Sequence, residues 1–149
     1  MTKAGQVRRG ARIAFDYGSA RIGVAVCDPE GIMASPLTTV DATSAAQFAD
    51  ISAIIDDYSP VELVVGNPRS LDGVERKAAK GAQEFCNNLA KHTDIPVILI
   101  DERLTTAGAH RAMSLAGKNS RQRRKTVDAA AAAIILQNYL DSLPPKDIG

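Results

Sequence analysis

The sequence predicts an α/β fold in which antiparallel strands are followed by parallel strands and flanking helices. Two short apolar segments near the N-terminus are separated by a three-residue turn, and later apolar runs alternate with helical patterns. At 149 residues and 45% hydrophobic composition, the chain can bury one core and is short for two. We therefore expect one domain over residues 1–149, with a mixed five-stranded sheet and flexible ends at 1–10 and 142–149.

The N-terminal part predicts an antiparallel meander. Strands are expected over 11–17 and 21–27, and the turn "DPEG" at 28–31 has Pro at its second position and Gly at its fourth. A third strand should follow in "IMASPLTTV", at 32–40. Pro36 favours an edge position for that strand, because proline cannot donate a hydrogen bond to a neighbouring strand.

From Thr43 the apolar residues take helical spacing, and this helix should end before Pro60. Two short apolar runs then enclose another helical pattern, an alternation typical of parallel crossovers. The remaining elements expected are a strand in "VELVVG" (61–66), a helix over 76–92, a strand in "PVILI" (96–100), and helices over about 105–116 and 124–141.

Several classes of protein are disfavoured by the composition. No apolar run of about 18 residues exists, and the first residues lack the pattern of a secretory signal, so we expect a soluble, cytoplasmic protein without a membrane partner. Cys27 and Cys86 have neither CxxC spacing nor nearby histidines, which predicts buried reduced thiols. His92 and His110 are interpreted as solvated helix residues rather than ligands.

Acidic residues follow three separate elements. Asp16 lies near the end of the first strand, Asp101 and Glu102 follow "PVILI", and Asp128 lies near the start of the last helix. If the first strand is central and the two later strands are its parallel neighbours, these acids meet at one sheet edge. Carboxylates without histidine or thiolate suit Mg²⁺ or Mn²⁺, and two such ions about 3.5 to 4 Å apart suit phosphodiester hydrolysis.

Each acid also has a structural interpretation. Asp16 can hydrogen-bond to the backbone of the turn that follows it, and Asp128 can complement a helix dipole. Glu102 can pair with Arg103 or Arg111 at the surface. The metal interpretation is favoured because acids from three distant segments are predicted at one edge, beside the most basic stretch of the chain.

That basic stretch predicts contact with nucleic-acid phosphates. Seven Lys or Arg and no Asp or Glu lie between Glu102 and Asp128, and the net charge of +1 conceals them. With three Phe, three Tyr and no Trp, the chain has little on which to stack bases. The alternative is a solvated loop with no partner. The candidates are Lys118, Arg121, Arg123, Arg124 and Lys125 in a loop before the last helix, with Arg21 and Arg69 as weaker ones.

Four segments resemble the signature blocks of the YqgF/RuvX family of Holliday junction resolvases and pre-16S rRNA nucleases. They are "IAFDYGSARIGVAV", "LVVGNPRSLDG", "PVILIDERLTT" and "KTVDAAAAAIILQNYLD", and they span most of residues 12–141. The resemblance implies a ribonuclease H-like nuclease domain whose catalytic, metal-binding acids are Asp16, Glu102 and Asp128. Asp101 is adjacent, and its share in metal binding stays open. Asn67 stands where the family commonly has Leu, which affects only loop contacts.

The resemblance also suggests a role for each residue of the first block. Asp16 would bridge two metal ions, while Glu102 and Asp128 would each serve mainly one. Gly18 would remove side-chain bulk beside the metal and the phosphate. Gly23 would allow close approach of another backbone segment.

Two other functions compete with a nuclease. "DYGSARIG" also resembles the phosphate loop of actin-like ATPases and sugar kinases, but those enzymes grip nucleotide between two such domains. A noncatalytic nucleic-acid-binding module, an RNA or transcription accessory factor, would have no need of the acids. Among nuclease substrates, a four-way DNA junction predicts a homodimer with two active sites, whereas trimming the 5′ end of pre-16S rRNA can be done by a monomer.

Overall fold

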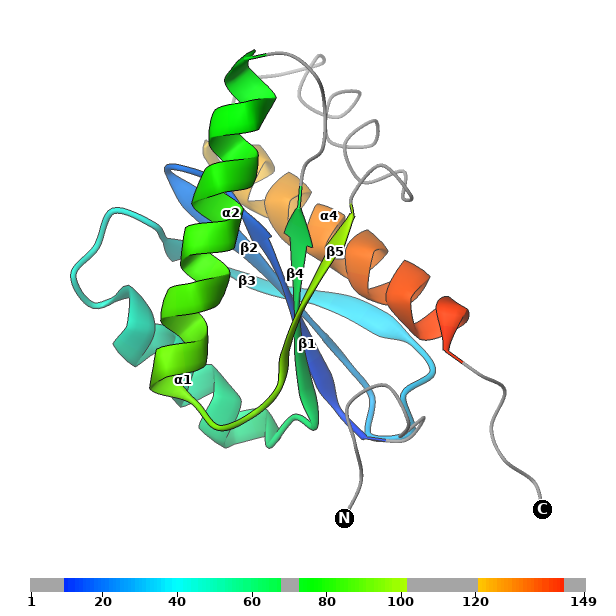
Figure 1. The fold of residues 1–149 in the computed structure, drawn as a ribbon. Coiled ribbons are helices and arrows are strands. Elements are labelled where there is room, and N and C mark those ends of the chain that lie inside the picture. The colour runs from blue at the N-terminus through cyan, green and yellow to red at the C-terminus, as the bar shows by residue number, and fades with distance from the viewer. Residues whose placement is uncertain (1–9, 68–72, 102–120, 144–149) are drawn as a thin grey trace.

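The computed structural model describes residues 10–67, 73–101 and 121–143, and Figure 1 shows how their elements are arranged. The elements are β1 (Arg12–Tyr17), β2 (Arg21–Cys27), β3 (Ala34–Asp41), α1 (Gln47–Tyr58), β4 (Glu62–Asn67), α2 (Gly73–His92), β5 (Val97–Asp101) and α4 (Arg121–Ser142). No helix in these three ranges is long and apolar enough to cross a membrane.

The five strands form one mixed sheet in the order β3-β2-β1-β4-β5. β1, β2 and β3 pair antiparallel, whereas β1 with β4 and β4 with β5 pair parallel. This confirms the predicted meander followed by parallel strands, with Pro36 in an edge strand. One expectation is corrected: β5 pairs with β4 and is not a direct neighbour of β1, so the end of β5 lies two strands away from β1.

Helices cover both faces of the sheet, with α1 and α2 on one face and α4 on the other (Figure 1). Successive side chains of β1 point to opposite faces of the sheet and so contribute to both cores. Ile13 and Phe15 belong to the core under α1 and α2, whereas Ala14 belongs to the core under α4. On the α4 side the sheet presents small residues such as Ala14 and Ala25. Small side chains let the helix backbone approach the strands closely.

Three helix starts differ from those predicted. α1 begins at Gln47 rather than near Thr43, because the Asp41 carboxylate accepts hydrogen bonds from the Thr43 N–H and hydroxyl and holds that segment in a turn. α2 begins at Gly73 and α4 at Arg121, each three residues early. Their first turns carry Glu, Lys, Arg and Gln, which favour helix without contributing to apolar periodicity. The helix expected over 105–116 lies outside the described residues.

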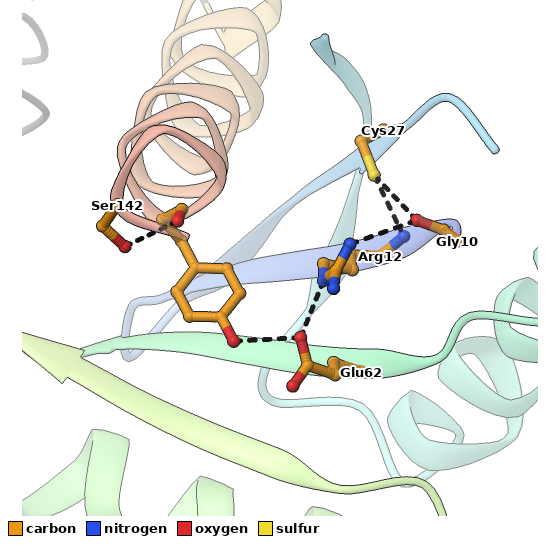
Figure 2. Close-up of polar contacts among 6 residues, drawn as sticks. Gly10, Arg12, Cys27, Glu62 and Ser142 are labelled. Carbon is orange, nitrogen blue, oxygen red and sulfur yellow. Dashed lines mark hydrogen bonds and ion pairs between the residues drawn. The ribbon is translucent and has the colours of Figure 1, made fainter. Parts of the chain in front are cut away.

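A buried polar cluster closes the sheet edge at which β1 and β4 begin (Figure 2). Arg12 Nε donates to Glu62 Oε1 at 2.7 Å, and the Tyr139 hydroxyl of α4 donates to the same oxygen at 2.9 Å. Arg12 and Glu62 are almost completely buried. Burial, and then the bond to Glu62, raise the pKa of Tyr139 well above its ordinary value. The cluster therefore fixes the C-terminal part of α4 to the sheet.

The two cysteines behave as the sequence predicts, since both are free and buried. Cys27 Sγ accepts the Arg12 backbone N–H at 3.1 Å in the cluster of Figure 2. Burial raises the pKa of both thiols, which keeps them protonated and unreactive. His92 is exposed on α2, as predicted, with its ring stacked on Phe48. His110 lies outside the described residues.

Candidate functional site

Asp16 is a buried carboxylate with a glycine opposite it on each neighbouring strand. It pairs with Gly23 of β2 and with Gly66 of β4, and it is 2% exposed. Neither neighbouring strand therefore places a side chain directly beside the carboxylate. Charged groups are rarely buried in this way unless the structure gives them a partner or a ligand.

Gly23 brings the second acid to the same place. A Cβ built on Gly23 would lie 2.0 Å from the carbonyl oxygen of Asp128 and 3.1 Å from the backbone nitrogen of Ala129. Only glycine permits α4 to lie this close to β2. Because Gly23 is the register partner of Asp16, the approach sets the Asp128 backbone next to the Asp16 position. Asp128 is itself buried, at 8% exposure.

A positively charged side chain, that of Arg21, contacts Asp128. Arg21 Nε donates to Asp128 Oδ2 at 2.8 Å, and the Arg21 side chain is 30% exposed. Arg21 is the first residue of β2 and stands in the turn region that follows Asp16 in the chain. The contact pairs a positive charge with the buried Asp128 carboxylate and so offsets its negative charge.

The third acid is expected where β5 ends. β5 runs parallel to β4, and Asp101 pairs with Asn67, so β1, β4 and β5 all present their carboxyl ends at the edge that carries Asp16. Asp101 ends the strand, and Glu102 lies outside the described residues. Within the described ranges no group of three His, Cys, Asp or Glu side chains that could hold a metal ion is found.

The described side of this site fits a hard divalent cation on three grounds. The donors are carboxylates, which Mg²⁺ and Mn²⁺ prefer, and Cys27 lies instead at the opposite edge of the sheet. A side chain at position 23 would displace Asp128, so the close approach is built into the backbone. The Arg21 guanidinium shows that positive charge is stable at Asp128.

The structure describes only some of the basic residues that the sequence predicts to bind nucleic acid. The structure corrects the predicted loop, because four of them lie in the first turns of α4 and only Lys118 precedes the helix in the chain. Arg and Lys are good helix formers, so the helix extends through them. Lys118 and Arg69 lie outside the described residues. The helical ones are Arg121, Arg123, Arg124 and Lys125.

The two glycines of the first block have different tasks. The prediction that Gly23 permits a close backbone approach is confirmed, and the approaching segment is α4. At Gly18, the nearest atom to an added Cβ is the Arg21 carbonyl oxygen, at 2.7 Å. Among the described residues Gly18 therefore serves the tight β1–β2 turn, and its predicted role beside the metal and phosphate stays a prediction.

Sequence reasoning missed the roles of Gly66 and of the Arg21–Asp128 contact. The Gly66 signal was present, since a glycine at the end of an apolar strand indicates close approach of another group. The ion pair joins residues far apart in the chain, and no spacing rule could have paired them.

Comparison with known proteins bears on the family of this chain. A family model described as RuvX, Holliday junction resolvase, matches residues 10–142. A Streptomyces coelicolor protein named "Putative pre-16S rRNA nuclease" is 45% identical over 139 residues, covering 92% of this chain and 83% of that protein. A Rhodococcus opacus protein of the same name is 45% identical over 151 aligned positions, covering 95% and 85% of the two chains.

A solved structure shares the architecture. T. thermophilus RuvC in complex with Holliday junction substrate superposes with a TM-score of 0.57 at 16% identity, covering 88% of this chain and 93% of that one. This likeness shows a ribonuclease H-like fold. Because the family model covers nearly the whole chain and the relatives match it along most of their length, the chain belongs to the RuvX family.

Proposed function

We propose that this protein is a metal-dependent nuclease that hydrolyses phosphodiester bonds of structured nucleic acid in the cytoplasm. The observation that carries the proposal is the close approach at Gly23, which brings Asp128 of α4 next to Asp16 of β1 in a chain of a nuclease family. Asp16, Asp128 and Glu102 would hold Mg²⁺ or Mn²⁺. Membership of the RuvX family supports a nuclease over a noncatalytic accessory factor or an actin-like nucleotide-binding domain.

Alternation along β5 favours Glu102 over Asp101 as the third ligand. Leu99 packs with the cluster on the α1 and α2 side, whereas Ile100 packs with the cluster on the α4 side, the side of Asp128. If this two-residue alternation continued past the end of β5, position 102 would share the face of Ile100. We therefore expect Glu102→Gln to cost more activity than Asp101→Asn.

The place of each acid in the fold suggests its task. Asp16 stands on the central strand, where the sheet would hold its carboxylate in a fixed position for binding the metal ions. Asp128 on α4 and Glu102 after β5 would each serve mainly one ion. When bound, such ions make a water nucleophilic near neutral pH and stabilise the leaving 3′ oxygen. The residues of this site need supply no serine, histidine or cysteine nucleophile.

The basic residues at the start of α4 would bind backbone phosphates. Four of them precede Asp128 in the same helix, namely Arg121, Arg123, Arg124 and Lys125. A nucleic-acid strand bound by them would therefore run toward the acids. Lys118, Arg69 and, once released from Asp128, Arg21 would extend this contact. Phosphate contacts position a substrate without specifying its bases, which suits recognition of a structured nucleic acid by shape.

Two substrates are compatible with the comparisons. The family description points to a four-way DNA junction, whereas the relatives' names point to pre-16S rRNA. A junction must be cut symmetrically, which needs two active sites and therefore a homodimer, whereas trimming an rRNA end needs one. Sedimentation of the protein alone and with each substrate would measure which assembly forms.

The test is side-by-side cleavage of a junction and of a pre-16S 5′ fragment at matched salt. Activity should require Mg²⁺ or Mn²⁺, disappear with EDTA, and not be sustained by Ca²⁺, whose longer bonds and looser geometry misplace the water. Cleavage that persists in excess chelator would contradict the metal-dependent proposal. An ATP-induced rise in melting temperature without cleavage would favour the actin-like alternative.

A further inference from the structure

Arg21 holds the carboxylate that the proposed function assigns to a metal ion. Its Nε donates to Asp128 Oδ2 at 2.8 Å, and the Asp128 side chain is only 11% exposed. Arg21 starts β2 directly after the β1–β2 turn, whereas Asp128 comes from the other end of the chain. The contact therefore forms only when α4 is seated on β2.

We propose that Arg21 is the resident counter-cation of Asp128 and that a divalent ion must displace it in order to bind. This inference rests on the proposed function, because it takes Asp128 as a metal ligand. Arg21 acts through Asp128 and is therefore a positioning residue for the metal. It makes the site stable without metal and lowers the site's affinity for the free ion.

Electrostatics explains why the metal-free site needs a cation. Asp16 and Asp128 are both buried, and the close approach at Gly23 sets the Asp128 backbone next to the Asp16 position, so two negative carboxylates there would repel. A buried charge is costly unless it is paired, and the Arg21 guanidinium pairs with one of the two. Because Arg21 balances the charge of Asp128, α4 can pack on β2 without a bound metal ion.

Electrostatics also explains the exchange. A divalent ion bound to Asp128 would lie within a few ångströms of a guanidinium held by the same carboxylate, and the two cations would repel strongly in a partly buried site. Arg21 is 30% exposed, so its long side chain can turn outward to solvent. The released guanidinium then carries donors suited to a substrate phosphate.

The first test measures metal binding without cleavage. Mn²⁺ is titrated into wild-type protein and Arg21→Gln, and the free ion is counted by electron paramagnetic resonance. We expect Arg21→Gln to bind Mn²⁺ about tenfold more tightly, a coupling of ordinary size. Equal affinities would overturn the inference.

A matched variant separates direct contact from the general field of a positive charge. Arg21→Lys keeps the charge but replaces the planar donor by a flexible, strongly hydrated ammonium. If direct contact matters, this variant should fall between wild type and Arg21→Gln in Mn²⁺ affinity. An affinity equal to that of the wild type would show that only the charge counts and would contradict displacement.

The second test follows the contact itself in the wild-type protein and needs no variant to fold. The Arg21 Nε–H resonance, assigned by its absence from Arg21→Gln or Arg21→Lys, should move toward the shift of a solvated arginine as Mg²⁺ is added. A resonance unchanged at saturating Mg²⁺ would contradict displacement. Failure of the wild type to bind Mn²⁺ at all would instead contradict the proposed function, so the two failures are distinguishable.

Discussion

At the scale of single residues, Gly23 connects the sheet, the helix and the acid site. It faces Asp16 across β1 and β2, and the Asp128 carbonyl occupies the space of its missing side chain. The contact is with backbone, so no rotamer change can relieve it. One methyl group at this position would therefore separate the two acids.

Gly23→Ala should destabilise the fold by about 1 to 3 kcal/mol, the usual cost of overpacking, and should lower cleavage by displacing Asp128. Urea unfolding and initial cleavage rates measure the two effects. The control is Gly81→Ala in α2, where an added Cβ would meet the end of the Tyr17 ring at 2.9 Å, a side chain that can move, while helix propensity improves. A Gly23→Ala variant as stable and active as the wild type would contradict the close approach.

Asp28 gives a residue-scale prediction about pH. Its carboxylate accepts backbone N–H groups from Met33, Ile32 and Glu30, and these bonds, that of Met33 foremost, lower its pKa below the ordinary 3.8. A lowered pKa contributes stability that is present above the ordinary value and is lost as pH falls through the folded one. Asp28→Ala should therefore cost about 1 kcal/mol near neutral pH.

The difference between wild type and Asp28→Ala should shrink as pH falls below about 4. Chemical unfolding of both proteins between pH 7 and pH 2.5 measures it. A difference that is constant over this range would show that the carboxylate charge does not hold the turn.

At the scale of elements, the parts of the structure that follow a local period were predictable and the parts that depend on tertiary contact were not. Both predicted N-terminal strands match β1 and β2 within one residue, because apolar runs bounded by turn residues leave little choice. The start of α4 at Arg121 was missed, because its charged first turns carry no apolar period. That Asp16 and Asp128 meet through Gly23 depends on how α4 packs, which spacing along the chain does not encode.

The attachment of α4 through Tyr139 gives an element-scale prediction. Its hydroxyl donates to Glu62 at 2.9 Å, and burial, with that bond, raises its pKa. A group whose folded pKa is raised contributes stability that is present below its ordinary value of about 10 and is lost as pH rises beyond it. Tyr139→Phe should therefore cost about 1 kcal/mol at pH 8.

That cost should diminish above pH 10, because the wild type alone must keep a buried hydroxyl protonated. Unfolding free energies of wild type and Tyr139→Phe between pH 8 and pH 11 measure the change, with Tyr58→Phe at an exposed tyrosine as the control. A cost that grows with pH would contradict the raised pKa. Cleavage by folded Tyr139→Phe should match the wild type, since Glu62 pairs with Arg12 at the start of β1 whereas Asp16 lies at the other end of that strand.

At the scale of the whole molecule, the two sheet edges have different tasks. The edge at Arg12 and Glu62 closes the fold with a satisfied polar cluster, while the edge at Asp16 and Asp128 carries the acids of the proposed site. α4 connects them, since Tyr139 near its end and Asp128 near its start contact opposite edges. The same helix therefore carries a structural contact at one edge and a proposed ligand at the other.

The basic start of α4 can be tested separately from catalysis. If Arg123 and Arg124 neutralise phosphates, their double alanine variant should bind all sequences more weakly, and the slope of log K against log salt should fall by about 1.4 to 1.8. Fluorescence anisotropy in Ca²⁺ measures both quantities. The matched control is a double alanine variant of Lys80 and Lys91, which are exposed on α2. This helix covers the face of the sheet opposite α4 (Figure 1), so the variant should leave the slope unchanged. An unchanged slope for the arginine variant would move the substrate path elsewhere.

The most direct test of a metal-dependent nuclease centred on Asp16 is single-turnover cleavage by Asp16→Asn in Mg²⁺ and in Mn²⁺. Its fold is checked by circular dichroism and its nucleic-acid affinity by anisotropy in Ca²⁺. Mutation of residues that only support metal ligands already lowers metal affinity or activity about 10- to 100-fold, so loss of Asp16, itself a proposed ligand, should lower cleavage more than about 100-fold. We expect a folded protein that binds substrate with unchanged salt dependence and does not cleave it. Wild-type cleavage by Asp16→Asn would contradict this expectation.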